Sequence, residues 1–174
     1  MKIQLASDLH LEFIHRMFPG EALISPAHGA DILVLAGDIA SGALAVEIYR
    51  EWPVPVLYVA GNHEFYGANV ERVRDDIRRA AEGTSVRFLD NDVADFGGVR
   101  FLGCTLWTDY CLYDDWSQEE LMANAERCLN DHRLIKTVDG PFTAARALHE
   151  HEESRSWLHR ELSQEYAGRT VCCR

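Results

Sequence analysis

Three short apolar segments in the first part of the chain constrain the fold more than any other feature. They are residues 3–6, 32–36 and 56–60, and each is followed at once by small or polar residues. Apolar, β-branched runs of this length are typical of buried strands. Helices are predicted at residues 41–51 and 67–82, and the repeated strand–helix–strand order predicts a parallel sheet.

The pattern changes in the second half of the chain. Three short strands are predicted at residues 86–89, 92–96 and 99–104. Gly97 and Gly98 predict a hairpin turn between the last two strands. Ser117 and Glu120 form a capping-box pattern at the start of a helix, and a longer helix is predicted over residues 143–166. We therefore expect an α/β fold in which the residues after 86 form a second, partly antiparallel layer.

Polar side chains with metal-binding chemistry follow all three early strands. These residues are Asp8, His10, Asp38, Asn62 and His63. Because the carboxyl ends of parallel strands meet at one edge of a sheet, we expect these side chains to lie in one crevice. Carboxylate, imidazole and amide ligands without a thiolate suit Mn, Fe, Zn, Ni or Co. Two divalent ions at such a site would leave it electropositive, which suits a phosphate group.

The same residues resemble the signature of a known family. Asp8-x-His10, Gly37-Asp38 and Gly61-Asn62-His63-Glu64 resemble the first three motifs of the calcineurin-like metallophosphoesterases. The resemblance implies a layered α/β sandwich of the metallophosphoesterase type and a binuclear metal centre.

The resemblance also implies a role for each matching residue. Asp8, His10 and Asp38 would hold one metal ion, Asp38 would bridge to a second, and Asn62 would bind that second ion. His63 would be the catalytic residue beside the substrate phosphate. The implied function is that of a metal-dependent phosphoesterase, or phosphatase, which hydrolyses a phosphate ester by a metal-activated hydroxide. The partner is then a phosphorylated substrate, which the sequence does not identify as a monoester, diester, nucleotide or phosphoprotein.

One departure from the family pattern changes the expectation for activity. The later histidine motifs of the family are absent, and the strand that begins at Thr170 is followed by Cys172-Cys173-Arg174. We therefore expect residues 1–174 to be a single, incomplete domain, truncated at its C-terminus by a frameshift or by a shortened product, rather than a natural short variant. The alternative function is a truncated, catalytically impaired metal-binding fragment. An exposed sheet edge in such a fragment predicts self-association.

Charge and composition indicate which classes of binding partner are disfavoured. The chain carries 17 Lys and Arg against 28 Asp and Glu, a net charge of −11. This field disfavours bulk nucleic-acid binding and binding to anionic membranes. No apolar run approaches transmembrane length, and no signal peptide is visible. The five cysteines form no C-x-x-C pair, which predicts reduced thiols and a cytoplasmic protein.

Some features have two open interpretations. Residues 105–110 either flank the phosphate site or form a hydrophobic corner. His149, His151 and His159 are better explained as a solvated helix face than as a metal site, because their spacing does not bring them together. Taken singly, Asp38 after its strand fits an ordinary turn, and Asn62 fits a helix cap. A Ser or Cys hydrolase is disfavoured because no G-x-S-x-G motif occurs.

Overall fold

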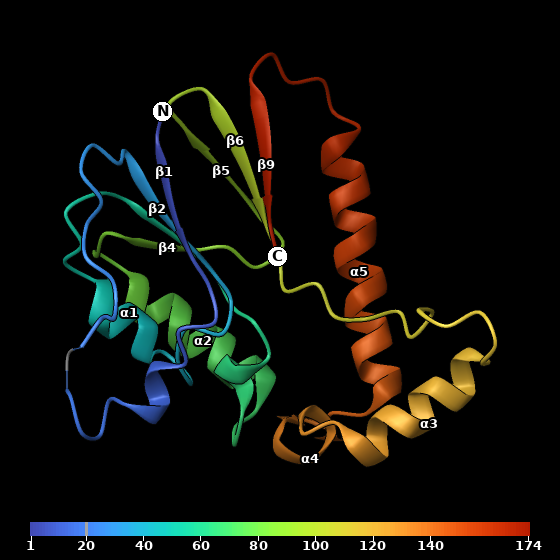
Figure 1. Cartoon of the computed structure of the whole chain (residues 1–174). Coiled ribbons are helices and arrows are strands. Elements are labelled where there is room, and N and C mark those ends of the chain that lie inside the picture. The colour runs from blue at the N-terminus through green and yellow to red at the C-terminus, as the bar shows by residue number, and fades with distance from the viewer. Residues whose placement is uncertain (20) are drawn as a thin grey trace.

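The first of two main sheets contains the three strands predicted from the early apolar runs. The computed structural model describes residues 1–19 and 21–174. In it β1 (Ile3–Ala6), β2 (Ile32–Ala36), β3 (Val56–Val59) and β4 (Val86–Phe88) lie side by side in chain order, and all are parallel (Figure 1). The α/β fold with a parallel sheet is therefore confirmed.

The second sheet contains β5 (Asp92–Phe96), β6 (Val99–Gly103) and β9 (Arg169–Cys173). β5 and β6 form an antiparallel hairpin, and β9 pairs with β6 in parallel. The sequence prediction was wrong about β4, which was grouped with this second layer. β4 belongs to the first sheet because the preceding helix is a crossover that returns the chain parallel to β3.

Among the described residues, four helices match predicted segments but are shorter, and a fifth, of four residues, was not predicted. They are α1 (Leu44–Tyr49), α2 (Val70–Ala81), α3 (Gln118–Cys128), α4 (Asp131–Leu134) and α5 (Ala144–Leu162), with 3-10 turns η1 (Leu11–Phe13) and η2 (His63–Phe65) and a small hairpin of β7 (Lys136–Thr137) and β8 (Gly140–Pro141). Ser117 and Glu120 form the predicted capping box of α3. Among the described residues, no helix is both long and apolar enough to cross a membrane.

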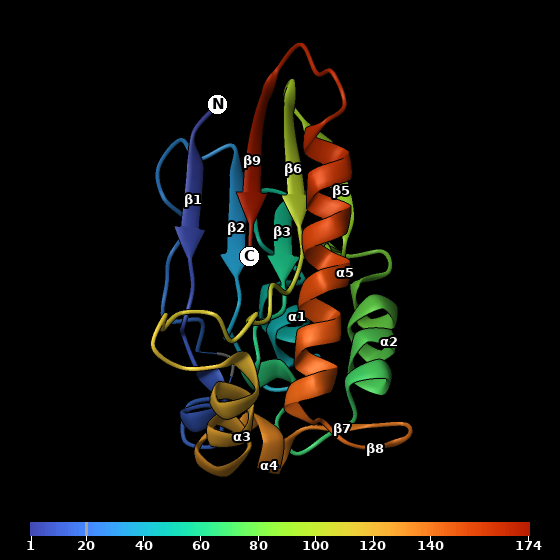
Figure 2. The same cartoon turned by 90° about the vertical axis from the view of Figure 1, so that its right-hand side faces the viewer.

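The molecule is built as four layers. α1 and α2 cover one face of the first sheet, the second sheet covers the other face, and α5 lies on the far side of the second sheet (Figures 1 and 2). Leu33 and Leu35 of β2 pack in the cluster that also holds residues of α1 and α2, whereas Ile32 and Val34 pack in the cluster that holds Phe101 of β6. The alternation explains why β2 is apolar at every position, since both faces of a parallel sheet are buried.

β1 is the exposed edge of the first sheet. Its outer side pairs with no described strand, and Leu5 is 67% exposed. Ile3 and Leu5 line an apolar groove of about 460 Å³ together with Val34 of β2 and Val171 of β9. The groove therefore lies where the edges of the two sheets approach each other.

A buried ion cluster joins α2 to α5. Arg74 Nη2 lies 2.8 Å from Glu150 Oε2, and the two side chains are 16% and 6% exposed. Arg146 Nε donates to the other carboxylate oxygen over 2.9 Å. Burial on its own would raise the pKa of Glu150, but the hydrogen bonds and positive charges of Arg74 and Arg146 lower it below its ordinary value. This cluster stabilises the fold above the ordinary pKa of a glutamate, and its contribution is lost as the pH falls through the lowered pKa.

Replacing Glu150 by Gln should test this cluster. E150Q is expected to lower the free energy of unfolding at neutral pH by about 2 kcal/mol, because charge-assisted hydrogen bonds to Arg74 and Arg146 are lost. The loss is limited because Asp90 and Glu71 still pair with the two guanidinium groups. At acid pH the difference from the wild-type chain should shrink. Urea unfolding at both pH values measures it, with E152Q at an exposed position of the same helix as the control. Equal losses in the two variants would contradict the assignment.

The exposed edge at β1 generates a second prediction. We expect the chain to self-associate, because an unpaired strand edge beside exposed apolar side chains favours contact with a second copy. L5K should reduce the association seen by light scattering across a concentration series. L112K is the matched control, since Leu112 is 81% exposed and lies outside both sheets. A monomeric wild-type chain throughout the series would contradict the prediction.

Candidate metal centre

The carboxyl ends of β1, β2 and β3 open into one pocket. The pocket has a volume of about 450 Å³ and is lined by Asp8, Asp38, Asn62, Asp131 and residues 105–108, among others. The sheet therefore brings Asp8, Asp38 and Asn62 from three successive strand ends into one pocket, whereas His10 and His63 do not line it. Of the two interpretations of residues 105–110, the structure places residues 105–108 in the wall of this pocket.

The backbone of the predicted ligands adopts a costly conformation. Asp8, His10 and Asp38 have φ values of 55°, 47° and 55°, which lie in the left-handed region. Such residues cost about 1–3 kcal/mol each and cluster at functional sites. Two hydrogen bonds hold the loops in place here: Asp8 N–H donates to Gly37 O over 3.1 Å, and His10 N–H donates to Asp38 O over 3.0 Å.

Asp8, His10 and Asp38 come close enough to share one ion. Each offers a ligand atom within 4.8 Å of the others. Asp38 Oδ1 is further fixed because it accepts the backbone N–H of His63 over 2.9 Å. Two carboxylates and one imidazole form an oxygen and nitrogen donor set that fits a divalent transition metal. These distances are consistent with the predicted role of the three residues as metal ligands, which stays a prediction.

Glu64 organises the loops that carry the ligands, a role that the sequence analysis did not assign. Its side chain is fully buried and accepts N–H donors from Asp38, Ile39 and Gly61 over 3.1, 2.8 and 2.8 Å. The Tyr58 hydroxyl donates a fourth hydrogen bond over 2.9 Å. Burial raises the pKa of Glu64, while the hydrogen bonds from Ile39 and Tyr58 oppose that rise. One side chain thus joins the loop after β2 to the loop after β3.

Gly61 leaves the space that the Asp38 carboxylate occupies. A Cβ atom at residue 61 would lie 2.2 Å from Asp38 Oδ1 and 2.7 Å from Asp38 N. No side chain fits there unless Asp38 moves. This glycine is therefore required by close approach and not by its φ angle.

Asn62 is held by residues from distant parts of the chain. Its side-chain amide nitrogen donates to Asp131 Oδ1 over 2.7 Å and to the Tyr66 hydroxyl over 3.0 Å. The Tyr66 hydroxyl in turn donates to Asp131 Oδ1 over 2.7 Å. Burial and the neighbouring Asp131 carboxylate raise the pKa of Tyr66, so its hydroxyl stays protonated and can donate.

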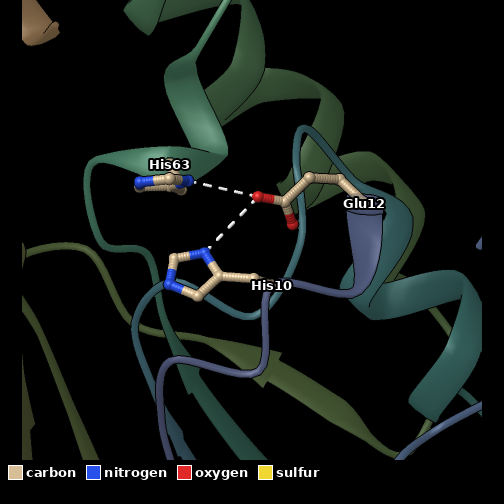
Figure 3. Close-up of side chains that lie close together, drawn as sticks. All are labelled: His10, Glu12 and His63. Carbon is tan, nitrogen blue, oxygen red and sulfur yellow. Dashed lines mark hydrogen bonds and ion pairs between the residues drawn. The ribbon is translucent and has the colours of Figure 1, made fainter. Parts of the chain in front are cut away.

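His63 contacts Glu12, a residue that the sequence analysis also missed. Figure 3 shows one Glu12 oxygen between the two imidazoles. His63 Nδ1 lies 3.1 Å from Glu12 Oε1, and His10 Nδ1 lies 3.4 Å from the same atom. The other ring nitrogen of each histidine points away from Glu12 (Figure 3). A carboxylate only accepts, so Glu12 favours the tautomer of His63 that carries its proton on Nδ1.

Among the described residues, two buried polar atoms of this cluster, His10 Nδ1 and Glu12 Oε2, make no hydrogen bond. His10 Nδ1 nevertheless lies at ion-pair distance from Glu12 Oε1. His10, Glu12 and His63 also form a second group whose ligand atoms lie within 4.8 Å of one another. His10 belongs to both groups. Because Nδ1 faces Glu12, the opposite ring nitrogen is the one free for an ion beside Asp8 and Asp38.

Replacing Gly61 by Ala should displace the Asp38 carboxylate. G61A is expected to lower the affinity for Mn²⁺ at least about 10-fold, the scale of a disturbed ligand environment. Equilibrium dialysis with elemental analysis measures the bound metal. G67A is the control, because Gly67 has φ of 75° but no atom within 4 Å of its Cβ position, so it reports backbone strain alone. An equal loss in both variants would show that general destabilisation, and not the contact with Asp38, is responsible.

Comparison with known proteins agrees with this geometry. The family model for calcineurin-like phosphoesterases matches residues 1–164. An uncharacterized protein, L509 of Acanthamoeba polyphaga mimivirus, is 27% identical over 154 residues, which cover 79% of this chain and 52% of that protein. The chain thus spans about half the length of that curated relative. Because the family model covers nearly the whole chain, the chain belongs to the calcineurin-like phosphoesterases, a family of metal-dependent hydrolases that act on phosphate esters.

Proposed function

We propose that the pocket at the ends of β1, β2 and β3 is the active site of a metal-dependent phosphoesterase. The observation that carries the proposal is the convergence of Asp8, His10 and Asp38, whose ligand atoms lie within 4.8 Å of one another. Asn62 lines the same pocket. His63 is next to Asn62, and its ring centroid lies 4.3 Å from that of His10.

The donor set suggests how two ions would be held. Asp8, His10 and Asp38 would hold the first, and Asp38 together with the amide oxygen of Asn62 would hold the second. Mn, Fe, Zn, Ni and Co all accept such oxygen and nitrogen ligands. When bound, divalent ions would supply positive charge to the phosphate oxygens and lower the pKa of water.

The residues of the chain prepare the rest of the site. Glu12 holds the His63 ring by Nδ1, so Nε2 is the atom free to face the substrate. In its protonated form His63 can donate the Nε2 proton to the leaving oxygen, which is the role of a general acid. Glu64 and Gly61 keep Asp38 in place while this happens.

The charge of the chain bears on the substrate and the compartment. A net charge of −11 repels phosphorylated molecules at long range, so attraction must come from cations in the pocket. The substrate is a phosphate ester of unassigned class. All five cysteines are free, which supports the proposal of a reducing compartment such as the cytoplasm.

A second candidate function is a metal-binding fragment with impaired catalysis. In the ligand set proposed above, the second ion has Asp38 and Asn62 as its ligands. A shared carboxylate and a neutral amide hold a cation more weakly than the three donors of the first site. We therefore expect the first ion to bind more tightly than the second, and turnover to rise only when the second site fills.

Metal content and hydrolysis of a nitrophenyl phosphate ester with added Mn²⁺ test the function. We expect feeble hydrolysis at most, because the second ion has few ligands, and a chelator should abolish what there is. D38A and H63A should each lower kcat by at least about 10²-fold, the scale of losing a general acid or an equally central group. D38A should also lose bound metal, whereas H63A should keep it.

Two outcomes separate the candidates. A chain that binds Mn²⁺ but hydrolyses no ester supports the impaired fragment, and a chain that binds no metal contradicts both. E12Q tests the role of Glu12 in orienting His63. It keeps the size of the side chain but replaces the carboxylate, which only accepts hydrogen bonds, by an amide. It should lower kcat about 10-fold, as expected for a residue that orients another. An unchanged kcat in E12Q would remove Glu12 from the proposed site.

A further inference from the structure

The contact between Asp131 and Asn62 joins two parts of the chain that are far apart in sequence. The two residues are separated by 69 positions, yet Asn62 Nδ2 lies 2.7 Å from Asp131 Oδ1. Both side chains line the same pocket as Asp8 and Asp38. The proposed function assigns no role to Asp131.

The chemistry of the contact decides which way the Asn62 amide points. An ionised carboxylate accepts hydrogen bonds and donates none, so it can face only the NH₂ group of an amide. Both recorded hydrogen bonds of the Asn62 side chain use Nδ2. Among the described residues, none donates to its amide oxygen. That oxygen is therefore left for a ligand of another kind.

The backbone holds Asp131 in position to do this. Asp131 is the first residue of α4. Gly67 N–H donates to Leu134 O over 2.9 Å, and Lys136 N–H donates to Ala68 O over 2.9 Å. These bonds join α4 and the start of β7 to the segment that follows η2. The backbone that carries Asp131 is therefore hydrogen-bonded to the segment after Asn62, so the contact does not depend on the Asp131 side chain alone.

Tyr66 completes the arrangement. Its hydroxyl donates to Asp131 Oδ1 over 2.7 Å and accepts from Asn62 Nδ2 over 3.0 Å. Asp131 Oδ1 thus accepts two hydrogen bonds, and Asn62 Nδ2 donates two. A flip of the amide would lose both bonds of Nδ2 and bring its oxygen against a carboxylate.

We propose that Asp131 is a positioning residue that fixes the side-chain amide of Asn62, so that the amide oxygen is presented to a divalent cation in the pocket. The inference rests on the proposed function, since it concerns the ligand that would hold the second ion. It assigns the orientation of that ligand to a residue outside the family motifs of the first half of the chain. Partners of this kind change metal affinity about 10- to 100-fold when they are removed.

Mn²⁺ titration of the whole chain, followed by electron paramagnetic resonance of free Mn²⁺, tests the inference. D131L removes the acceptor and excludes water from its place. It is expected to weaken the lower-affinity Mn²⁺ site about 10- to 100-fold, and to leave the tighter site unchanged. D131N keeps an acceptor oxygen of the same size and should stay close to the wild-type affinity. If D131L does not fold, as judged by circular dichroism, D131A replaces it.

A double-mutant cycle separates positioning from a general structural effect. N62A should lose the lower-affinity site, and D131L added to N62A should cause no further loss, because Asp131 acts through Asn62. Y66F is expected to weaken the same site less than D131L, since Asp131 keeps its direct bond to Asn62.

The outcomes distinguish this inference from the proposed function. If the wild-type chain binds two ions and N62A loses one, but D131L binds both as well as wild type, the inference is wrong and the proposed ligand set stands. If D131N weakens binding as much as D131L, Asp131 acts through its charge or as a ligand itself, which also overturns positioning. If the wild-type chain binds no second ion, or N62A binds it normally, the assignment of Asn62 fails and the inference fails with it.

Discussion

The buried carboxylate of Glu64 is the interaction on which the site depends. Loops at strand ends leave backbone N–H groups without partners, and such groups are costly when they are buried. Glu64 satisfies N–H groups of Asp38, Ile39 and Gly61 with two oxygen atoms. It thereby joins two loops that have no strand pairing of their own. The buried charge is tolerated because four donors surround it.

The strained backbone at the pocket follows from that support. Asp8, His10 and Asp38 adopt left-handed φ values at successive strand ends, and none of them is a glycine. The strain is repeated because each loop must turn its polar side chain into the same pocket. At Gly61 the loops allow no side chain, since the Asp38 carboxylate fills that space. Stability and ligand geometry are therefore set by the same few contacts.

Much of the fold could be predicted from the sequence, because its signals are local. Apolar runs located β1, β2 and β3, and the Ser117 and Glu120 pair located the start of α3. β4 was assigned to the wrong sheet because a three-residue strand has the same pattern in either layer. The predicted helix before it was the signal that could have placed it parallel to β3. Helix ends also differed by several residues, because tertiary packing decides them.

The candidate site also contains residues that the sequence could identify and residues that it could not. Asp8, His10, Asp38, Asn62 and His63 could be named because they lie in short motifs at strand ends. Glu12 and Asp131 could not, because each is defined by a contact across 51 or 69 residues. Neither residue has a pattern of its own, and only the folded chain brings it to its partner. Glu64 was part of a motif, but its role is visible only from the donors that it collects.

The docking of α4 makes the geometry of the pocket depend on a marginal element. α4 has four residues, and no buried residue belongs to it. Short elements with little buried apolar surface open more readily than the sheets around them. Each opening would release Asp131 from Asn62 while both sheets stay intact. The apparent affinity of the pocket for a cation would then scale with the fraction of molecules in which α4 is docked. Hydrogen exchange at the Gly67 amide would report that fraction, since this amide donates to Leu134 O at the end of α4.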